Sequence, residues 1–286
     1  MTTSTAQPPR RKPIRWGNIV VLVLLSFGLA FTLLPFVWMV LGAFKTKAEI
    51  MARPITWWPK APTLANFKAW LVDYDISRPF FNSVLLAVIT VAATLIFCSM
   101  VGWALAKLQF PGKRILIGVV LSTMFVPGIV TLIPQFVIIA RLGLVNTYGG
   151  LILPGLVGAF GVFLMRQFML EIPDELLDAA RIDGAGEFRI FFRIVLPLCK
   201  APMATLAIFT FMGSWNSFLW PLIISQDDRM YTLPVALALF SSDTGNHGTE
   251  YGLQMAGSFL IVLPILVLFI AMQRHFIQGI TMTGLK

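Results

Sequence analysis

The stretch PFFNSVLLAVITVAATLIFCSMVGWALA, from Pro79 to Ala106, contains no Asp, Glu, Lys or Arg. A helix needs about 20 apolar residues to cross about 30 Å of hydrocarbon, so this stretch is long enough to span a membrane. Five further charge-free stretches share that property, and they cover residues 16–44, 115–140, 142–165, 201–226 and 251–273. The sequence therefore predicts an all-α integral membrane protein with six transmembrane helices.

The composition of the whole chain supports this prediction. Of its 286 residues, 57% are hydrophobic and 12% are charged, against about 25% charged in a typical soluble domain. So few charges cannot cover a surface that faces water, which argues against a soluble enzyme and excludes a disordered chain or a disulfide scaffold. Cys98 lies inside a predicted span and Cys199 beside a predicted loop, so both are expected to be packing residues rather than a disulfide.

The net charge of +9 is accounted for by topology. If the amino terminus is cytoplasmic, Lys and Arg concentrate on that side of the membrane, as the positive-inside rule requires. The chain is then divided into a cytoplasmic tail (1–15), a six-helix transmembrane domain (16–275) and a second cytoplasmic tail (276–286). No nucleic-acid partner is expected. A cleavable signal peptide is the alternative for the first segment, but its apolar run is longer than such peptides carry.

The predicted cytoplasmic loop at 171–200 is unusual because it is rich in acids. It contains six of the 13 acidic residues of the chain, which are Glu171, Asp174, Glu175, Asp178, Asp183 and Glu187. Its middle is predicted to form two short helices, because acids suit the positive end of a helix dipole and Gly184–Gly186 interrupts the pattern. A small amphipathic helix held away from the membrane suits insertion into a groove on a partner protein.

Spacing predicts which side chains of the loop share a face. In the first helix, Leu176, Ala179, Ala180 and Asp183 are expected together. In the second helix, Phe188, Phe191, Phe192 and Val195 are expected to line one side, before Pro197 ends the helix.

The segment Glu175 to Pro197, ELLDAARIDGAGEFRIFFRIVLP, resembles the EAA loop of ABC-importer permeases. That pattern has an acidic-Ala-Ala triplet, here Asp178-Ala179-Ala180, then a glycine, here Gly184, and ends in Ile-x-Leu-Pro, here residues 194–197. Asp178 replaces the Glu that is usual in the motif. Further segments are similar to the carbohydrate-uptake branch, in particular the smaller permease subunit of the maltose type, and these are residues 104–114, 143–154, 214–221 and 276–286.

The resemblance implies the type I importer permease fold, with the loop docked as a coupling helix on a cytoplasmic ATP-binding subunit. The residues that it places at this contact are Glu175, Leu176, Asp178, Ala179, Ala180, Asp183, Gly184 and Pro197. The chain has no GxxxxGK[ST] motif, so it is not expected to be an enzyme, and ATP and Mg are expected on the partner. No catalytic, cofactor or metal site is expected in this chain.

The resemblance also implies partners and a location. These are two copies of the ATP-binding subunit, a second permease subunit of different sequence, an extracytoplasmic solute-binding protein and membrane lipid. The expected location is the plasma (inner) membrane of a bacterium or archaeon, as a multi-pass protein with both termini in the cytoplasm.

Candidates for the solute pathway lie in the fifth predicted span. Gly213, Asn216, Ser217 and Trp220 have the spacing of one helical face. An amide, a hydroxyl and an aromatic ring suit a sugar, whose hydroxyls need hydrogen bonds while its C–H face stacks on a ring. The alternative is that Asn216 and Ser217 join helices and Trp220 is an interfacial anchor.

The absence of ionisable residues from the predicted spans bears on the cargo. A proton-coupled carrier normally needs such a residue as a relay. A cation within the spans would favour binding of an anionic solute, and the predicted spans contain no Lys or Arg. The preferred function is therefore a permease subunit for a sugar or polyol, forming half of the pathway of an ATP-driven importer. An ion-coupled secondary transporter and a membrane scaffold or receptor remain alternatives, and glycerol phosphate or an amino sugar remain possible cargoes.

Overall fold

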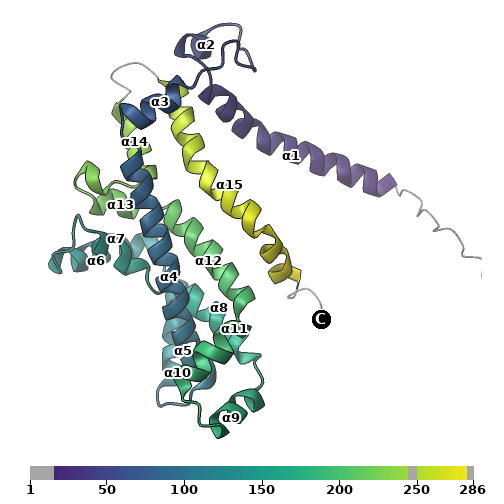
Figure 1. Ribbon diagram of the computed structural model, residues 1–286, viewed down its shortest axis with the longest axis vertical. Helices are drawn as coiled ribbons and strands as arrows, with labels where there is room; N and C mark the ends of the chain where they lie inside the picture. The colour runs from purple at the N-terminus through teal and green to yellow at the C-terminus, as the bar shows by residue number, and fades with distance from the viewer. Residues whose placement is uncertain (1–15, 244–249, 282–286) are drawn as a thin grey trace, which may run out of the picture.

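The structure is a computed structural model that describes residues 16–243 and 250–281, and it contains helices and turns with no strand in that part of the chain (Figure 1). Three helices are long, namely α1 (Trp16–Ala43), α4 (Ser77–Lys107) and α15 (Tyr251–Thr281). Each is long and apolar enough to cross a membrane. These helices confirm that the stretches at 16–44, 79–106 and 251–273 are helical.

The other helices are shorter. Between α1 and α4 lie α2 (Lys47–Met51) and α3 (Ala65–Val72). The middle of the chain forms α5 (Lys113–Thr123), α6 (Gly128–Arg141), α7 (Tyr148–Ile152), η1 (Leu153–Gly155) and α8 (Ala159–Leu170). After these come α9 (Asp174–Ile182), α10 (Glu187–Ile190), η2 (Phe191–Val195), α11 (Leu196–Leu198), α12 (Lys200–Trp215), α13 (Leu219–Ile224), η3 (Asp228–Met230) and α14 (Leu233–Asp243).

Three bent helix pairs complete the possible spans, which number up to six if each pair counts as one. The chain bends by 108° between residues 113–123 and 128–141. It bends by 44° between residues 148–155 and 159–170, and by 81° between residues 187–198 and 200–215. Pro127 precedes the first residue of α6 and Pro154 lies in η1. Because proline lacks the N–H that continues a helix, bends are expected at these positions.

The tightest packing joins α4, α8 and α12. A Cβ atom on Gly161 of α8 would lie 2.9 Å from Cys98 Sγ, and one on Gly102 of α4 would lie 2.9 Å from Met165 Cβ. These glycines therefore let the helix backbones approach closely, as small residues do in membrane proteins. Cys98 and Cys199 are both free and buried in this core, which confirms that they are packing residues.

A second core lies where α3, α14 and α15 meet the end of α1. The buried indole of Trp70 donates from Nε1 to the Leu253 carbonyl at 2.7 Å, and its ring lies 4.9 Å from that of Phe240. Leu233 and Phe240 bury α14 against this core, so α14 packs on the protein. By contrast, the described apolar side chains of α1 are exposed from Ile19 to Val37, which suits contact with lipid.

Candidate functional site

The segment after α8 forms the two short helices that the sequence predicts. The first, α9, ends at Ile182, and the chain turns at Gly184, whose φ is +79°. Only glycine adopts that left-handed conformation without strain. The second helix begins as α10 at Glu187 and continues through a π-helical turn, η2, to α11, which contains Pro197.

The start of α9 is anchored to the end of α4 by Lys107. Its Nζ donates to the Ile172 carbonyl at 2.6 Å and to Asp174 Oδ1 at 2.7 Å, while the Lys107 side chain is only 7% exposed. The Lys107 hydrogen bond holds the pKa of the Asp174 carboxyl below its usual value. Since α4 is a long helix of the bundle, movement of α9 is mechanically tied to it.

A second anchor crosses the glycine turn. Arg181 Nη1 lies 2.7 Å from Asp178 Oδ1, and Arg181 Nε lies 2.8 Å from Glu187 Oε1. The two carboxylates raise the pKa of Arg181, with the Glu187 hydrogen bond contributing most. One guanidinium therefore joins α9 to α10, so the two short helices are held as one unit.

The prediction that Leu176, Ala179, Ala180 and Asp183 share one face of α9 holds for three of the four residues. Leu176, Ala179 and Asp183 are exposed, whereas Ala180 is buried and packs in the core beside Leu177. Glu175, Asp178, Gly184 and Pro197, the other residues predicted to contact an ATP-binding subunit, are all exposed. Ala180 is thus the member of the acidic-Ala-Ala triplet that fixes the helix to the bundle.

The predicted single face of the second helix is wrong. Phe191 and Val195 are buried, but Phe188 is 71% exposed and Phe192 is 47% exposed. The reason is the π-helical turn at Phe191–Val195, which changes the angular spacing that the prediction assumed. Two aromatic rings of this helix are consequently exposed.

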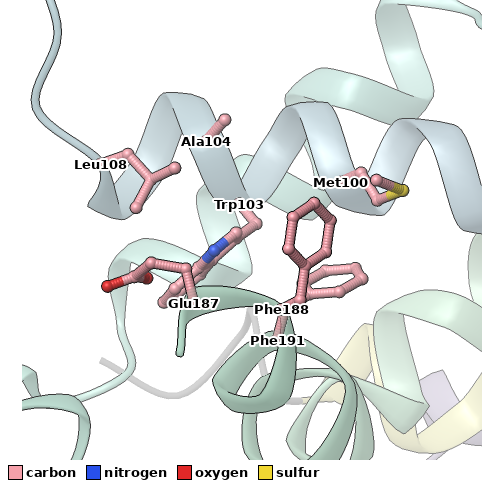
Figure 2. Close-up of a pocket in the computed structure, with 7 residues that line it drawn as sticks. All are labelled: Met100, Trp103, Ala104, Leu108, Glu187, Phe188 and Phe191. Carbon is pink, nitrogen blue, oxygen red and sulfur yellow. The ribbon is translucent and has the colours of Figure 1, made fainter. Parts of the chain in front are cut away.

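A small apolar hollow with a volume of about 180 Å³ lies between this helix and α4, and the exposed Phe188 forms part of its wall. Figure 2 shows Phe188 and Phe191 beside Trp103 of α4, with Met100, Ala104, Leu108 and Glu187 completing the lining. The ring centroids of Trp103 and Phe191 are 6.5 Å apart. Aromatic packing therefore joins the second helix to α4, as Lys107 joins the first.

Sequence reasoning missed three residues of this site. Lys107 lies outside the loop, and its only signal was its place as the charge that ends the stretch at 79–106. Ile182 is 86% exposed although it is apolar, and Phe188, which was predicted to share one face with Phe191, is 71% exposed. An isolated Ile between Arg181 and Asp183 was the available sign of an outward apolar contact.

The predicted pathway residues do not lie on one helical face. Helix α12 ends at Trp215 and α13 begins at Leu219, so the chain turns between them. Gly213, Ser217 and Trp220 nevertheless line one pocket of about 310 Å³. Asn216 is not part of the lining, because as the C-cap of α12 its exposed side chain donates back to the Met212 carbonyl at 3.0 Å.

The rest of this pocket comes from α4, α7 and η1 and from further residues of α12 and α13. Its lining also contains Leu86 and Thr90 of α4, Leu151 of α7, Pro154 and Gly155 of η1, Thr210 and Ser214 of α12, and Pro221 of α13. Trp220 Nε1 donates to the Gly150 carbonyl at 3.2 Å, which fixes the ring against α7. The pocket thus combines hydroxyl groups with an oriented indole and has no charged residue in its lining.

Residues 98–282 match the family described as "Binding-protein-dependent transport system inner membrane component", which includes the whole loop and the pocket helices α12 and α13. The chain belongs to this family. A permease protein of an arabinooligosaccharide transport system from Halalkalibacterium halodurans is 40% identical over 92% of this chain and 96% of its own length. The corresponding lactose transport permease of Rhizobium radiobacter is 34% identical over 93% of this chain and 95% of its own length.

Solved structures show the same fold. A chain of a bacterial ABC transporter that imports the acidic polysaccharide alginate superposes with a TM-score of 0.80, at 23% identity, over 94% of this chain and 100% of that one. This protein is therefore an ABC-importer permease subunit, a multi-pass inner-membrane protein and not an enzyme. The family assignment favours the importer over the ion-coupled carrier and the scaffold.

Proposed function

We propose that this chain forms half of the translocation pathway for a neutral sugar or polyol and couples to a separate ATPase through residues 171–200. The observation that carries the cargo class is the uncharged pocket in which Ser214, Ser217 and Thr210 accompany the Trp220 ring. Hydroxyl groups pair with sugar hydroxyls, and an indole face stacks on sugar C–H groups. Relatives named for arabinooligosaccharides and lactose support the same class.

The coupling role rests on how the loop is held. Lys107 and the Arg181 clamp make α9 and α10 one unit that is attached to α4. This unit leaves Ile182 and Phe188 exposed, two apolar side chains that a partner surface would cover. An ATP-binding subunit that received them in a cleft would transmit its closure directly to α4.

The remaining partners follow from this role. Two ATP-binding subunits carry ATP and Mg, a second permease subunit of different sequence supplies the other half of the pathway, and an extracytoplasmic protein delivers the solute. A solved alginate transporter bound to its periplasmic protein has this kind of partner and shares the fold, with a TM-score of 0.61. In this proposal both termini lie in the cytoplasm, on the side of the basic residues that precede α1 and begin α5.

Solute-stimulated ATPase of the purified complex in nanodiscs tests the cargo. Arabinooligosaccharides, lactose, a polyol, an amino sugar and glycerol 3-phosphate are compared, each with the cognate binding protein present. Stimulation by neutral compounds and not by glycerol 3-phosphate is expected. Replacing Ser217 with Ala should raise the half-maximal solute concentration about threefold to tenfold, the value of one hydrogen bond, while Asn216→Leu should change it less. Equal effects of the two variants would show that the pocket does not hold the solute.

Coupling is tested separately with Gly184→Asp and Ala180→Arg in the same complex. Both should lower solute-stimulated ATPase and transport together, since one strains the turn and the other places a charge where α9 packs. Wild-type stimulation in both variants, with all chains still co-purifying, would contradict the proposed contact.

A further inference from the structure

A basic hollow lies where α4 ends and α5 begins, and it shares no lining residue with the apolar hollow described above. It has a volume of about 580 Å³, and its lining contains Lys113, Arg114, Arg166 and Gln109 but no acidic residue. Figure 1 shows that this end of α5 lies at the same end of the molecule as α9 and α10. Under the proposed topology, the hollow therefore opens near the cytoplasmic surface of the membrane.

The three cations of the hollow have no carboxylate partner in the described part of the chain. The ion pairs found there are Lys47 with Glu250, Lys107 with Asp174, and Arg181 with Asp178 and Glu187. Three unpaired cations around one concave surface create a positive potential that attracts an anion.

Two of these cations are held in place by the backbone. Arg166 Nε donates to the Leu105 carbonyl at 3.2 Å, and Lys113 Nζ donates to the carbonyls of Ala106 at 3.2 Å and Leu108 at 2.8 Å. The two terminal nitrogens of Arg166 have no partner among the described residues, nor has the guanidinium of Arg114. The hollow is thus a positioned set of donors suited to phosphate oxygens, which guanidinium groups bind in pairs.

The backbone adds to the same potential. Helix α5 begins at Lys113 after Gly112, whose φ is +83°, and no side chain caps its first N–H groups. The positive end of the α5 dipole therefore points into the region that the cations line.

An exposed apolar strip leads away from the hollow along α5. Ile115, which is in the lining, is 72% exposed, and Leu116 and Val119 are 49% and 52% exposed. A free phosphate ion would gain nothing from this strip, whereas the acyl chains of a lipid would lie against it.

We propose that this hollow binds the phosphate headgroup of an anionic phospholipid of the cytoplasmic leaflet, with Arg114 and Arg166 on the phosphate and the acyl chains along α5. Basic pockets between transmembrane helices on that side of a membrane are suited to such headgroups. The site is separate from the cargo pocket and requires no particular solute.

Native mass spectrometry of the intact complex, extracted from nanodiscs of phosphatidylcholine with a minor fraction of phosphatidylglycerol, measures the retained lipid. Arg114→Gln is the test variant because Arg114 is exposed and has no structural hydrogen bond among the described residues. Arg141→Gln is the control, since Arg141 is also an exposed cation, lies at the last residue of α6 and is not in the lining of the hollow. Wild type and Arg141→Gln should retain phosphatidylglycerol, and Arg114→Gln should bind it about fivefold more weakly, as expected for one basic residue.

Three outcomes would overturn the proposal. Equal retention by Arg114→Gln and Arg141→Gln would show that the hollow does not hold the lipid, and loss of a co-purifying chain in Arg114→Gln would instead assign it to an acidic partner surface. Adding inorganic phosphate to nanodiscs of phosphatidylcholine with phosphatidylglycerol provides the third arm. Displacement of the lipid by millimolar phosphate would show that the site recognises the free ion; persistence of the lipid is expected.

Discussion

Lys107 Nζ and Asp174 Oδ1 lie 2.7 Å apart although the two residues are 67 positions apart in the sequence. The pair is asymmetric, because the Lys107 side chain is 7% exposed and the Asp174 side chain is 73% exposed. The buried ammonium also binds the carbonyls of Ile172 and, at 3.4 Å, Leu170. Its main contribution is therefore to hold the chain between α8 and α9, and the exposed carboxylate adds to it.

Lys107→Met should destabilise the protein more than Asp174→Asn. Methionine keeps the volume but leaves the Ile172 carbonyl without its donor, which costs about 1–3 kcal/mol, whereas an exposed ion pair contributes little. Thermal unfolding of the purified complex measures the difference, and solute-stimulated ATPase should fall with Lys107→Met. If Asp174→Asn proved the more damaging change, the carboxylate and not the backbone would be the anchor.

The contribution of Asp174 should depend on pH in one direction. Lys107 lowers the pKa of Asp174 from its usual 3.8, so the folded state favours the ionised carboxyl. The stability difference between wild type and Asp174→Asn is therefore fully present above pH 3.8 and is lost as the pH falls through the lowered folded-state pKa. Unfolding temperatures of both proteins, measured from neutral pH downward, should converge; a difference that grew on acidification would contradict the ion pair.

Gly184 and Gly186 offer a matched comparison within the loop. A Cβ atom would meet nothing within 4 Å at either position, but only Gly184 has a positive φ, +79°. Gly184→Ala should therefore cost about 1–2 kcal/mol of backbone strain and weaken ATPase stimulation, and Gly186→Ala should be near neutral. Similar losses in both variants would indicate that flexibility of the turn, and not its left-handed conformation, is required.

Gly161→Ala should overpack the contact between α4 and α8. The added methyl group would lie 2.9 Å from Cys98 Sγ and 3.1 Å from Leu206 Cδ1, which predicts a loss of about 1–3 kcal/mol. Combining it with Cys98→Ala should recover part of that loss, because the sulfur is the nearest obstacle. Gly118→Ala in α5, where the space is open, is the control, and unfolding temperature is the measurement. No recovery in the double variant would mean that Leu206 sets the limit.

Ile182→Asp and Phe188→Asp should uncouple the importer without destabilising this chain. Their side chains are 86% and 71% exposed, so a carboxylate is readily hydrated in the free permease but not in an apolar cleft of a partner. Co-purification of the ATP-binding subunit should decrease in both. Phe191→Asp, at a residue 2% exposed, should instead unfold the loop, and equal behaviour of Phe188→Asp and Phe191→Asp would place Phe188 in the core.

Much of the loop could be predicted because its determinants are local. The acid-rich start of α9, the glycine break and the second helix follow from caps, dipoles and spacing that act within a few residues. The prediction of a single aromatic face was wrong at the π-helical turn, because Phe191 and Val195 are buried in the core that contains Trp103 of α4. The spacing of residues within one segment cannot predict a contact with a helix that is remote in the sequence.

The pathway residues show the same limit. Ser217 and Trp220 were predicted by residue type and do line the pocket, but Asn216 does not. The prediction assumed one continuous helix through residues 213–220, and the break after Trp215 has no proline or charge to mark it before Pro221. The predicted helical face therefore included Asn216, whose side chain the turn directs away from the pocket.

Absence of charge was sufficient to determine the helical membrane class, because the hydrocarbon core excludes unpaired charges and unsatisfied backbone whatever the packing. The motif at 175–197 predicted the importer-permease family, and the family match over residues 98–282 confirms that family. Tertiary structure alone decided that Lys107 anchors this loop, that Ile182 and Phe188 face outward, and that Lys113, Arg114 and Arg166 surround one hollow. These relationships depend on distances between residues remote in sequence, which local spacing and composition do not determine.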